Sequence, residues 1–221
     1  MIAGQSARPS DPLEASLLAA MAAIAPPDLR IGCRLISAGD EAYLLPDELR
    51  AVTTCDPVAR RASGAARHVA HELLAGLGHA GAPIGRESSG QPVWPEGIVG
   101  SLAHDDLVAV AVVASRTAVA SVGIDVEAAE PLPSELSTLV VTDEDVPGPV
   151  HRDLAGRLVF AAKEACYKAA YPLDGVFLDH DDIAVDLAES RARTRTGIGA
   201  QLFWCTAPRV VVLAIVRIDR A

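Results

Sequence analysis

The two lysines of this chain lie close together on one predicted helix. Lys163 and Lys168 are five residues apart, and the other 17 of the 19 basic residues are arginine. A lysine ammonium can approach a phosphate as a compact point charge or give up its proton, and an arginine guanidinium does neither readily. The alternative is chance together with an ordinary i,i+4 pair of Glu164 and Lys168. The placement by itself leaves both interpretations open.

A second pair of chemically useful residues ends a predicted strand, in the sequence Gly123-Ile124-Asp125-Val126-Glu127. Because side chains alternate along a strand, we expect the carboxylates of Asp125 and Glu127 on one face, roughly 6–7 Å apart. At an effective dielectric near 20, two such charges repel by about 2–3 kcal/mol, and a shared divalent cation would reverse that cost. An acidic turn that faces solvent is the competing interpretation.

His104 is expected close to these two carboxylates. Residues 107–114 and 118–126 are rich in β-formers and are separated by three residues, which predicts an antiparallel hairpin. His104 would enter the first strand and Asp125 would leave the second, so the two residues would be neighbours. A histidine beside two carboxylates suits metal or phosphate binding, whereas a single histidine is more often structural.

The remaining pattern predicts a mixture of helices and strands. Helices are expected at 15–25, 57–78 and 154–170, and further strands at 183–187, 199–205 and 209–218. In the second helix Arg60, Arg67 and His71 share the face opposite the apolar one. Residues 81–97, with four glycines and three prolines, are expected to form an ordered loop that lines a site, and the acidic segment 131–149 a loop or lid.

Composition narrows the class of protein. The chain has 221 residues, half of them hydrophobic, so it can bury a core of its own. A net charge of −10 argues against a nucleic-acid binder. The apolar runs are far shorter than the roughly 20 residues that span a bilayer, so we expect no membrane segment. The four cysteines lack CxxC spacing and are expected to be free thiols in a reducing cytoplasm: Cys33, Cys55, Cys166 and Cys205.

Three blocks of the sequence resemble the phosphopantetheinyl transferases of the surfactin-synthase and enterobactin-synthase type. The first is GQPVWP at 90–95 running into GSLAH at 100–104, the second is VGIDVE at 122–127, and the third is FAAKEACYK at 160–168. The helix with Ala66-Arg67-His68 resembles the enterobactin-type subgroup. Together the resemblance covers about residues 57–178.

This resemblance implies an α+β fold of two similar α/β halves packed as one pseudo-twofold monomer. We expect residues 1–117 to form the first half and 118–221 the second, with coenzyme A and Mg²⁺ bound at their seam. The implied activity is transfer of the 4′-phosphopantetheine moiety of coenzyme A to a serine of an acyl or peptidyl carrier protein, with release of 3′,5′-ADP. The alternative is a non-catalytic module that binds coenzyme A or a carrier protein.

The family motifs also imply roles for individual residues. Asp125, Glu127 and Glu164 match the metal ligands, and Lys168 and His104 match positions that contact the pyrophosphate. Arg67 and Arg86 match basic positions near the 3′-phosphate of the coenzyme, with Ser101 beside them. Arg60 or Arg61 is expected to substitute for a further basic residue at the start of the same helix. Either Glu164, directly or through a water, or Lys163 would accept the serine proton, and Lys163 also counts among the coenzyme-binding positions.

Two positions depart from the family pattern. Ala103 stands where relatives commonly have Ser or Thr, and Ala59 where a basic residue often begins the phosphate-binding helix, so we expect altered coenzyme affinity.

Arg191, Arg193 and Arg195 alternate and suggest a docking role toward acidic carriers, but exposed arginines on an edge strand are the preferred interpretation. Fatty-acid, polyketide and nonribosomal-peptide or siderophore carriers all remain open, and the enterobactin-like blocks favour secondary metabolism.

Overall fold

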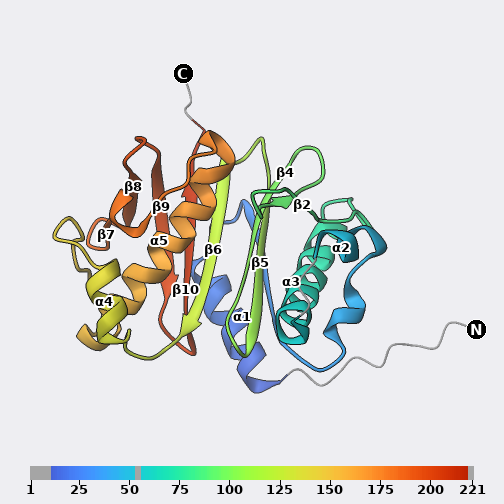
Figure 1. Ribbon diagram of the computed structural model, residues 1–221, viewed down its shortest axis with the longest axis horizontal. Helices are drawn as coiled ribbons and strands as arrows, with labels where there is room; N and C mark the ends of the chain where they lie inside the picture. The colour runs from blue at the N-terminus through green and yellow to red at the C-terminus, as the bar shows by residue number, and fades with distance from the viewer. Residues whose placement is uncertain (1–10, 53–55, 219–221) are drawn as a thin grey trace, which may run out of the picture.

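Two antiparallel sheets, each crossed by one long helix, make up the computed structural model, which describes residues 11–52 and 56–218 (Figure 1). The first sheet has the strand order β1-β5-β4 and the second the order β6-β10-β9-β8-β7. The chain passes from one sheet to the other between β5 and β6. The expected mixed α/β architecture is thereby confirmed.

The first sheet and its helices take up the N-terminal part of the chain. Their bounds are α1 Pro12–Ile24, β1 Leu29–Leu35, η1 Asp40–Tyr43, α2 Pro46–Ala51, α3 Pro57–Ala75, β2 Gly85–Arg86, β3 Pro92–Val93, β4 Ile98–His104 and β5 Val108–Ser115. The helix α3 packs on one face of the β1-β5-β4 sheet through Val69, Ala70 and Leu74. Strand β5 is apolar and buried from Val108 to Ala114, as a strand covered on both faces must be.

The second sheet follows the same plan. Its elements are β6 Ser121–Ala128, α4 Ser134–Val140, α5 Arg152–Asp174, η2 His180–Asp182, β7 Ile183–Asp186, β8 Arg191–Thr194, β9 Gly199–Cys205 and β10 Arg209–Val216. The buried face of α5 consists largely of small residues, among them Ala162, Ala165 and Ala169, so the helix can lie close to the sheet. It ends at Gly175, whose left-handed backbone (φ 66°) suits a residue without a side chain.

A shared core joins the two sheets. Residues of β4 and β5 pack with residues of β6 and β10 and with Leu17 and Met21 of α1 in one buried cluster. Arg209 of β10 also forms an ion pair with Asp105, in the turn between β4 and β5, with 3.2 Å between Nε and Oδ2. The seam is therefore a packed interface, and the division into halves at residue 117 stays a prediction.

Several expectations about single elements are corrected. The predicted 107–126 hairpin is wrong, because β5 pairs with β1 and β4 whereas β6 pairs with β10. The true hairpin joins β4 to β5, at a turn where Asp105 accepts hydrogen bonds from the amides of Leu107 and Val108. The 81–97 loop contains the short β2–β3 ladder, and the 131–149 loop contains α4. Alternating hydrophobicity indicates that a segment forms a strand, but it does not indicate with which other strand that segment pairs.

Other expectations about the described residues are confirmed. The helices at 15–25, 57–78 and 154–170 form as α1, α3 and α5, and the three C-terminal strands form as β7, β9 and β10. Cys33, Cys166 and Cys205 are free, and Cys55 lies outside the described residues. In 11–52 and 56–218, none of the helices has the length and apolar character needed to cross a bilayer.

The arginine-bearing strand β8 is not the edge strand that was expected. It lies between β7 and β9, and Arg191 and Arg195 pair with Asp186 and Asp182. Arg193 is exposed on the same strand. The edge-strand interpretation of these arginines is therefore wrong, and two of them are held by neighbouring carboxylates.

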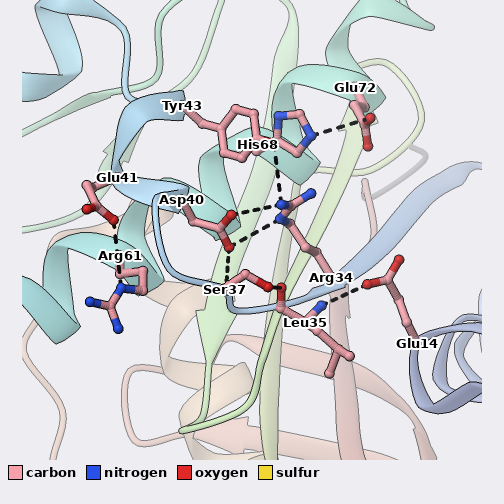
Figure 2. Close-up of polar contacts among 10 residues, drawn as sticks. All are labelled: Glu14, Arg34, Leu35, Ser37, Asp40, Glu41, Tyr43, Arg61, His68 and Glu72. Atoms are coloured by element: carbon pink, nitrogen blue, oxygen red, sulfur yellow. Dashed lines mark hydrogen bonds and ion pairs between the residues drawn. The ribbon is translucent and has the colours of Figure 1, made fainter. Parts of the chain in front are cut away.

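A buried carboxylate, Asp40, fixes the η1 turn to Arg34 of β1, and the same turn packs on α3 (Figure 2). Arg34 donates to both oxygens of Asp40, at 2.8 and 3.3 Å, and the amide of Ser37 donates to the same group. Tyr43 stacks on His68 of α3 with 3.8 Å between ring centroids. A side chain at Gly64 of α3 would overlap the backbone of Asp40, so only glycine allows this contact.

A second buried carboxylate, Glu48 of α2, holds three other segments together. Its oxygens accept hydrogen bonds from the amide of Leu45 (2.9 Å), the amide of Ile84 (2.7 Å) and Nε2 of His71 (2.7 Å). Burial alone would raise the pKa of Glu48, but these hydrogen bonds outweigh it and hold the pKa below its ordinary value. The folded protein therefore favours the ionised form.

We expect Glu48 to make stability depend on pH. Because its folded-state pKa is depressed, its contribution is present above its ordinary pKa and is lost as the pH falls through the folded-state value. The substitution Glu48→Gln should reduce the free energy of unfolding by about 1–3 kcal/mol at neutral pH, and the gap should shrink below about pH 4. Urea denaturation across this range measures it. Asp47→Asn, at the exposed neighbouring carboxylate, is the control, and a gap independent of pH would contradict the assignment.

Candidate active site at the seam of the two sheets

The close approach of α5 to β6 creates this site. Gly123 of β6 faces α5, and a side chain there would overlap the carbonyl oxygen of Ala165. With glycine in place, Lys168 reaches across from α5, and its Nζ lies 2.6 Å from Oδ1 of Asp125 and 3.3 Å from the carbonyl oxygen of Ile124. The segment Gly123-Ile124-Asp125 thus brings the carboxylate of a strand residue and the ammonium group of a helix residue together.

Asp125 is a buried carboxylate whose surroundings disfavour its ionised form. It is 6% exposed, and burial raises its pKa to about 7 even though Lys168 stabilises the ionised form. The charges of Glu164 and Glu127 contribute to this rise, so both of these predicted metal ligands lie within electrostatic reach of Asp125. Its Oδ2 is buried and has no hydrogen-bond partner among the described residues. A buried carboxylate oxygen in this setting suits a divalent cation.

Glu127 lies on the same strand but is bound by Arg157 of α5, at 2.8 Å. Burial raises the pKa of Glu127, and the charge and hydrogen bond of Arg157 oppose that rise. Sequence reasoning missed Arg157. Arg157 lies seven residues before Glu164 and eleven before Lys168, which places all three on one helix face and is the signal that identifies it.

The three carboxylates are neighbours without forming a tight cluster. In the described part of the chain, the oxygens that gather within 4.8 Å of one another belong instead to Asp179, Asp181 and Asp182, on the surface turn η2. Exposed acidic turns of this kind are common without a metal. The three predicted ligands nevertheless suit a cation for two reasons. One oxygen of Asp125 is buried and has no partner among the described residues, and all the donors are carboxylates.

His104 lies at the exposed end of β4, beside the same group. Its pKa is lowered first by desolvation and then by the positive charge of Lys168, so the two side chains are close enough to interact. His104 thus lies near Lys168, although the hairpin from which it was predicted does not exist, and its contact with Asp125 stays a prediction. The turn between β4 and β5 and the packing of the two sheets bring it there instead.

The Lys163 ammonium does not join Asp125, Glu127 and Lys168. It is completely buried, and its Nζ contacts the carbonyl oxygens of Val140 (2.8 Å) and His180 (2.9 Å) and Oδ2 of Asp145 (2.7 Å). Adjacent residues on a helix point about 100° apart, so Lys163 and Glu164 face different neighbours. Lys163 fastens α5 to the segments around α4 and η2.

A cavity of about 510 Å³ opens beside Lys168. The β2–β3 hairpin, β4 and the C-terminal part of α5 enclose it, and its lining includes Arg86, Ser101 and Lys168, as expected. Sequence reasoning missed Arg116, Tyr167 and Tyr171, which also line it. Four other predicted coenzyme-binding residues do not line this cavity: Arg60 and Arg67 on α3, His104 and Lys163.

Arg67 is nevertheless close to the cavity wall. It is 6% exposed, its Nε donates to the carbonyl oxygen of Ile84 at 3.2 Å, and Ile84 lies two residues before Arg86. Burial lowers the pKa of Arg67, the charge of Glu48 opposes this, and the charge of Arg86 adds to it. Two guanidinium groups therefore lie near one another at this end, a favourable setting for a polyvalent anion.

We expect Gly123→Ala to weaken the packing of α5 on β6. The added methyl group overlaps the Ala165 carbonyl, so helix and strand must separate, at a cost of about 1–3 kcal/mol in the free energy of unfolding. Chemical denaturation measures the change. Gly199→Ala is the matched control, because a side chain there meets nothing within 4 Å on a strand of the same sheet. Equal stability of the two variants would show that the close approach is unimportant.

We also expect Lys163→Met to act on stability. It leaves the Asp145 carboxylate buried and unpaired, and breaking a buried ion pair in this way costs about 3–5 kcal/mol. The double variant Lys163→Met/Asp145→Leu should recover part of the loss, and thermal denaturation of the four proteins in the cycle gives the coupling energy. A Lys163→Met protein as stable as the wild type would contradict this structural role.

Comparison with known proteins gives the same picture for both halves of the chain. Residues 47–114 match the family model of the 4′-phosphopantetheinyl transferase N-terminal domain, and residues 121–216 match that of the 4′-phosphopantetheinyl transferase superfamily. The two matches together cover most of the chain. They name neither the surfactin-synthase nor the enterobactin-synthase subgroup, so the subgroup stays a prediction.

Three curated relatives agree with the family models. The 4′-phosphopantetheinyl transferase PptT of Mycobacterium tuberculosis is 37% identical over 145 residues, which are 62% of this chain and 63% of the relative. The enzyme Npt of Nocardia iowensis is 38% identical over 144 residues (60% and 62%), and Svp of Streptomyces mobaraensis is 36% identical over 154 residues (65% and 61%). The chain thus spans less than two thirds of the length of each relative. With both family models matched in chain order, this chain belongs to the 4′-phosphopantetheinyl transferase superfamily.

Proposed function

We propose that this protein transfers the 4′-phosphopantetheine moiety of coenzyme A to a serine of an acyl or peptidyl carrier protein and releases 3′,5′-ADP. The observation that carries the proposal is Asp125, a buried carboxylate with one unpartnered oxygen and with Lys168 on the other, next to a cavity with cationic walls. Membership of the superfamily supports the same reaction.

The cavity has the features that a phosphorylated substrate needs. Arg86 and Lys168 supply positive charge, Ser101 supplies a hydroxyl, and the Trp94, Tyr167 and Tyr171 side chains supply apolar and aromatic surface. On a protein with a net charge of −10, a local group of cations is the feature that lets an anion bind. In this proposal Lys168 and His104 contact the pyrophosphate of coenzyme A.

The carboxylates supply the metal site of the proposal. Asp125, Glu127 and Glu164 would hold a divalent cation, Mg²⁺ by preference, which stabilises negative charge on the pyrophosphate oxygens when it is bound. The fit rests on an all-oxygen donor set, which Mg²⁺ favours, and on the buried oxygen of Asp125 that has no other partner among the described residues.

The chemical step is a displacement at the phosphorus nearest the pantetheine arm. The serine oxygen of the carrier forms the new P–O bond, and the bond to the 3′,5′-ADP oxygen breaks. Lys168 donates a hydrogen bond to the departing phosphate, and Glu164 accepts the serine proton directly or through a water. Of the two candidate bases, Glu164 is preferred because it interacts with Asp125, whereas the ammonium of Lys163 is enclosed by Asp145 and two carbonyl groups.

Further parts of the proposal rest on the resemblance. Carriers of secondary metabolism, such as nonribosomal-peptide, polyketide or siderophore synthases, follow from the enterobactin-like blocks. A monomer acting in the cytoplasm follows from the family and from the free cysteines. A panel of carrier proteins of each type, assayed side by side, would identify the preferred partner.

We predict that an apo carrier protein incubated with coenzyme A and Mg²⁺ gains the mass of phosphopantetheine. Asp125→Asn should reduce kcat by at least about 10²-fold, because the cation loses a ligand and Lys168 loses its partner. Mass spectrometry and a discontinuous rate assay measure the two results, with Asp47→Asn as the control. Tight binding of coenzyme A without any mass gain would favour the non-catalytic module, and near-normal turnover of Asp125→Asn would remove Asp125 from the metal site.

A further inference from the structure

Arg67 is a buried cation that has no carboxylate partner among the described residues. Its guanidinium is 6% exposed, and its one hydrogen bond there joins Nε to the carbonyl oxygen of Ile84. Glu48 acts on this guanidinium through its charge but forms no ion pair with it, and burying a cation without a direct ion pair is costly. An anion that enters from outside would complete the arrangement, and in the proposed function this anion is the 3′-phosphate of coenzyme A.

Ile84 connects this arginine to Glu48. The carbonyl oxygen of Ile84 accepts from Arg67 at 3.2 Å, and the amide of the same residue donates to Oε1 of Glu48 at 2.7 Å. Ile84 itself is fully buried in the core between α3 and the first sheet. Its peptide groups therefore lie in a fixed place, and each end of the residue has a charged partner.

Glu48 also acts on α3 directly. His71, which lies four residues after Arg67 on the same helix, contacts Oε1 of Glu48 at 2.7 Å. The side chain of Glu48 is completely buried and does not line the cavity, so it has no contact with a bound coenzyme. One carboxylate thus holds the helix that carries Arg67 and the strand that leads to Arg86.

We infer that Glu48 is a positioning residue for the 3′-phosphate end of the coenzyme site. It acts through the Ile84 amide and through His71 to hold Arg67 at the wall from which Arg86 projects. Its negative charge also opposes the effect of burial on the Arg67 guanidinium. The inference rests on the proposed function, since it takes coenzyme A as the ligand, and it adds a residue that the sequence motifs do not contain.

The test compares coenzyme A with 3′-dephospho-coenzyme A, which lacks the one group that Arg67 and Arg86 are expected to bind. Dissociation constants from calorimetry and values of KM and kcat are measured for wild type, Glu48→Gln and Glu48→Ala. For coenzyme A, Glu48→Ala should raise Kd and KM by at least about tenfold with kcat within about twofold of wild type. For the dephosphorylated analogue, Kd and KM should change by less than about twofold. Glu48→Gln should be intermediate, because its amide oxygen can still accept from Ile84.

A matched control separates positioning from simple loss of stability. Asp40→Asn weakens the contact of η1 with Arg34 of β1 (Figure 2) without touching Glu48, Ile84 or Arg67, so it should lower Tm and leave the preference for coenzyme A over the analogue unchanged. If Glu48→Ala does not fold, the milder Glu48→Gln is combined with Arg67→Gln. The effect of Glu48→Gln on the preference should then disappear, because both residues act on one contact.

The outcomes distinguish the inference from the proposed function. Equal weakening of both ligands by the Glu48 variants, or unchanged affinity for both, would overturn the positioning role. If the wild type modifies no carrier protein, the proposed transfer fails, and the calorimetric preference for coenzyme A over its dephosphorylated form still decides whether Glu48 acts on a phosphate-binding Arg67.

Discussion

The contact between α5 and β6 is the constraint on which the rest of the site depends. Gly123 has no side chain, so the helix backbone at Ala165 lies against the strand, and the buried Asp125 carboxylate meets the Lys168 ammonium at the edge of the cavity. Burial of Asp125 there raises its pKa, whereas the nearby lysine lowers it. The protein keeps a carboxylate in a place where only a cation makes it stable, which is the property that a metal and pyrophosphate site requires.

Helix α5 divides its charged residues between two tasks by their direction. Arg157, Glu164 and Lys168 lie on the face toward β6 and the cavity, where Arg157 holds Glu127 and Lys168 holds Asp125. Lys163 points elsewhere and is enclosed by Asp145 and two backbone carbonyl groups. The two lysines of one motif therefore have different roles. Lys163 fixes the helix to its neighbours, and Lys168 belongs to the site.

The opposite end of the cavity depends on two buried carboxylates around α3. Asp40 holds the η1 turn to Arg34 of β1, and Glu48 holds α3 to the segment before β2. Arg67 lies between these contacts as a buried cation that has no carboxylate partner in the described part of the chain. The fold thus stabilises an electropositive wall at one end of the cavity and an acidic group near the other, which matches the charge distribution of a phosphorylated ligand and its counter-ion.

The sequence by itself determined the helices α1, α3 and α5, the strands β7, β9 and β10, and the motifs whose residues gather beside Lys168. These features depend on local periodicity and on residue types, which neighbours along the chain express directly. Tertiary structure alone decided that β5 and β6 belong to different sheets, that Arg157 binds Glu127, that Lys163 turns away from Glu164, and that Glu48 reaches Arg67 through Ile84. Each of these depends on which distant segments pack together. A side chain's partners are fixed only by the tertiary structure, because they come from segments that are far away in the sequence.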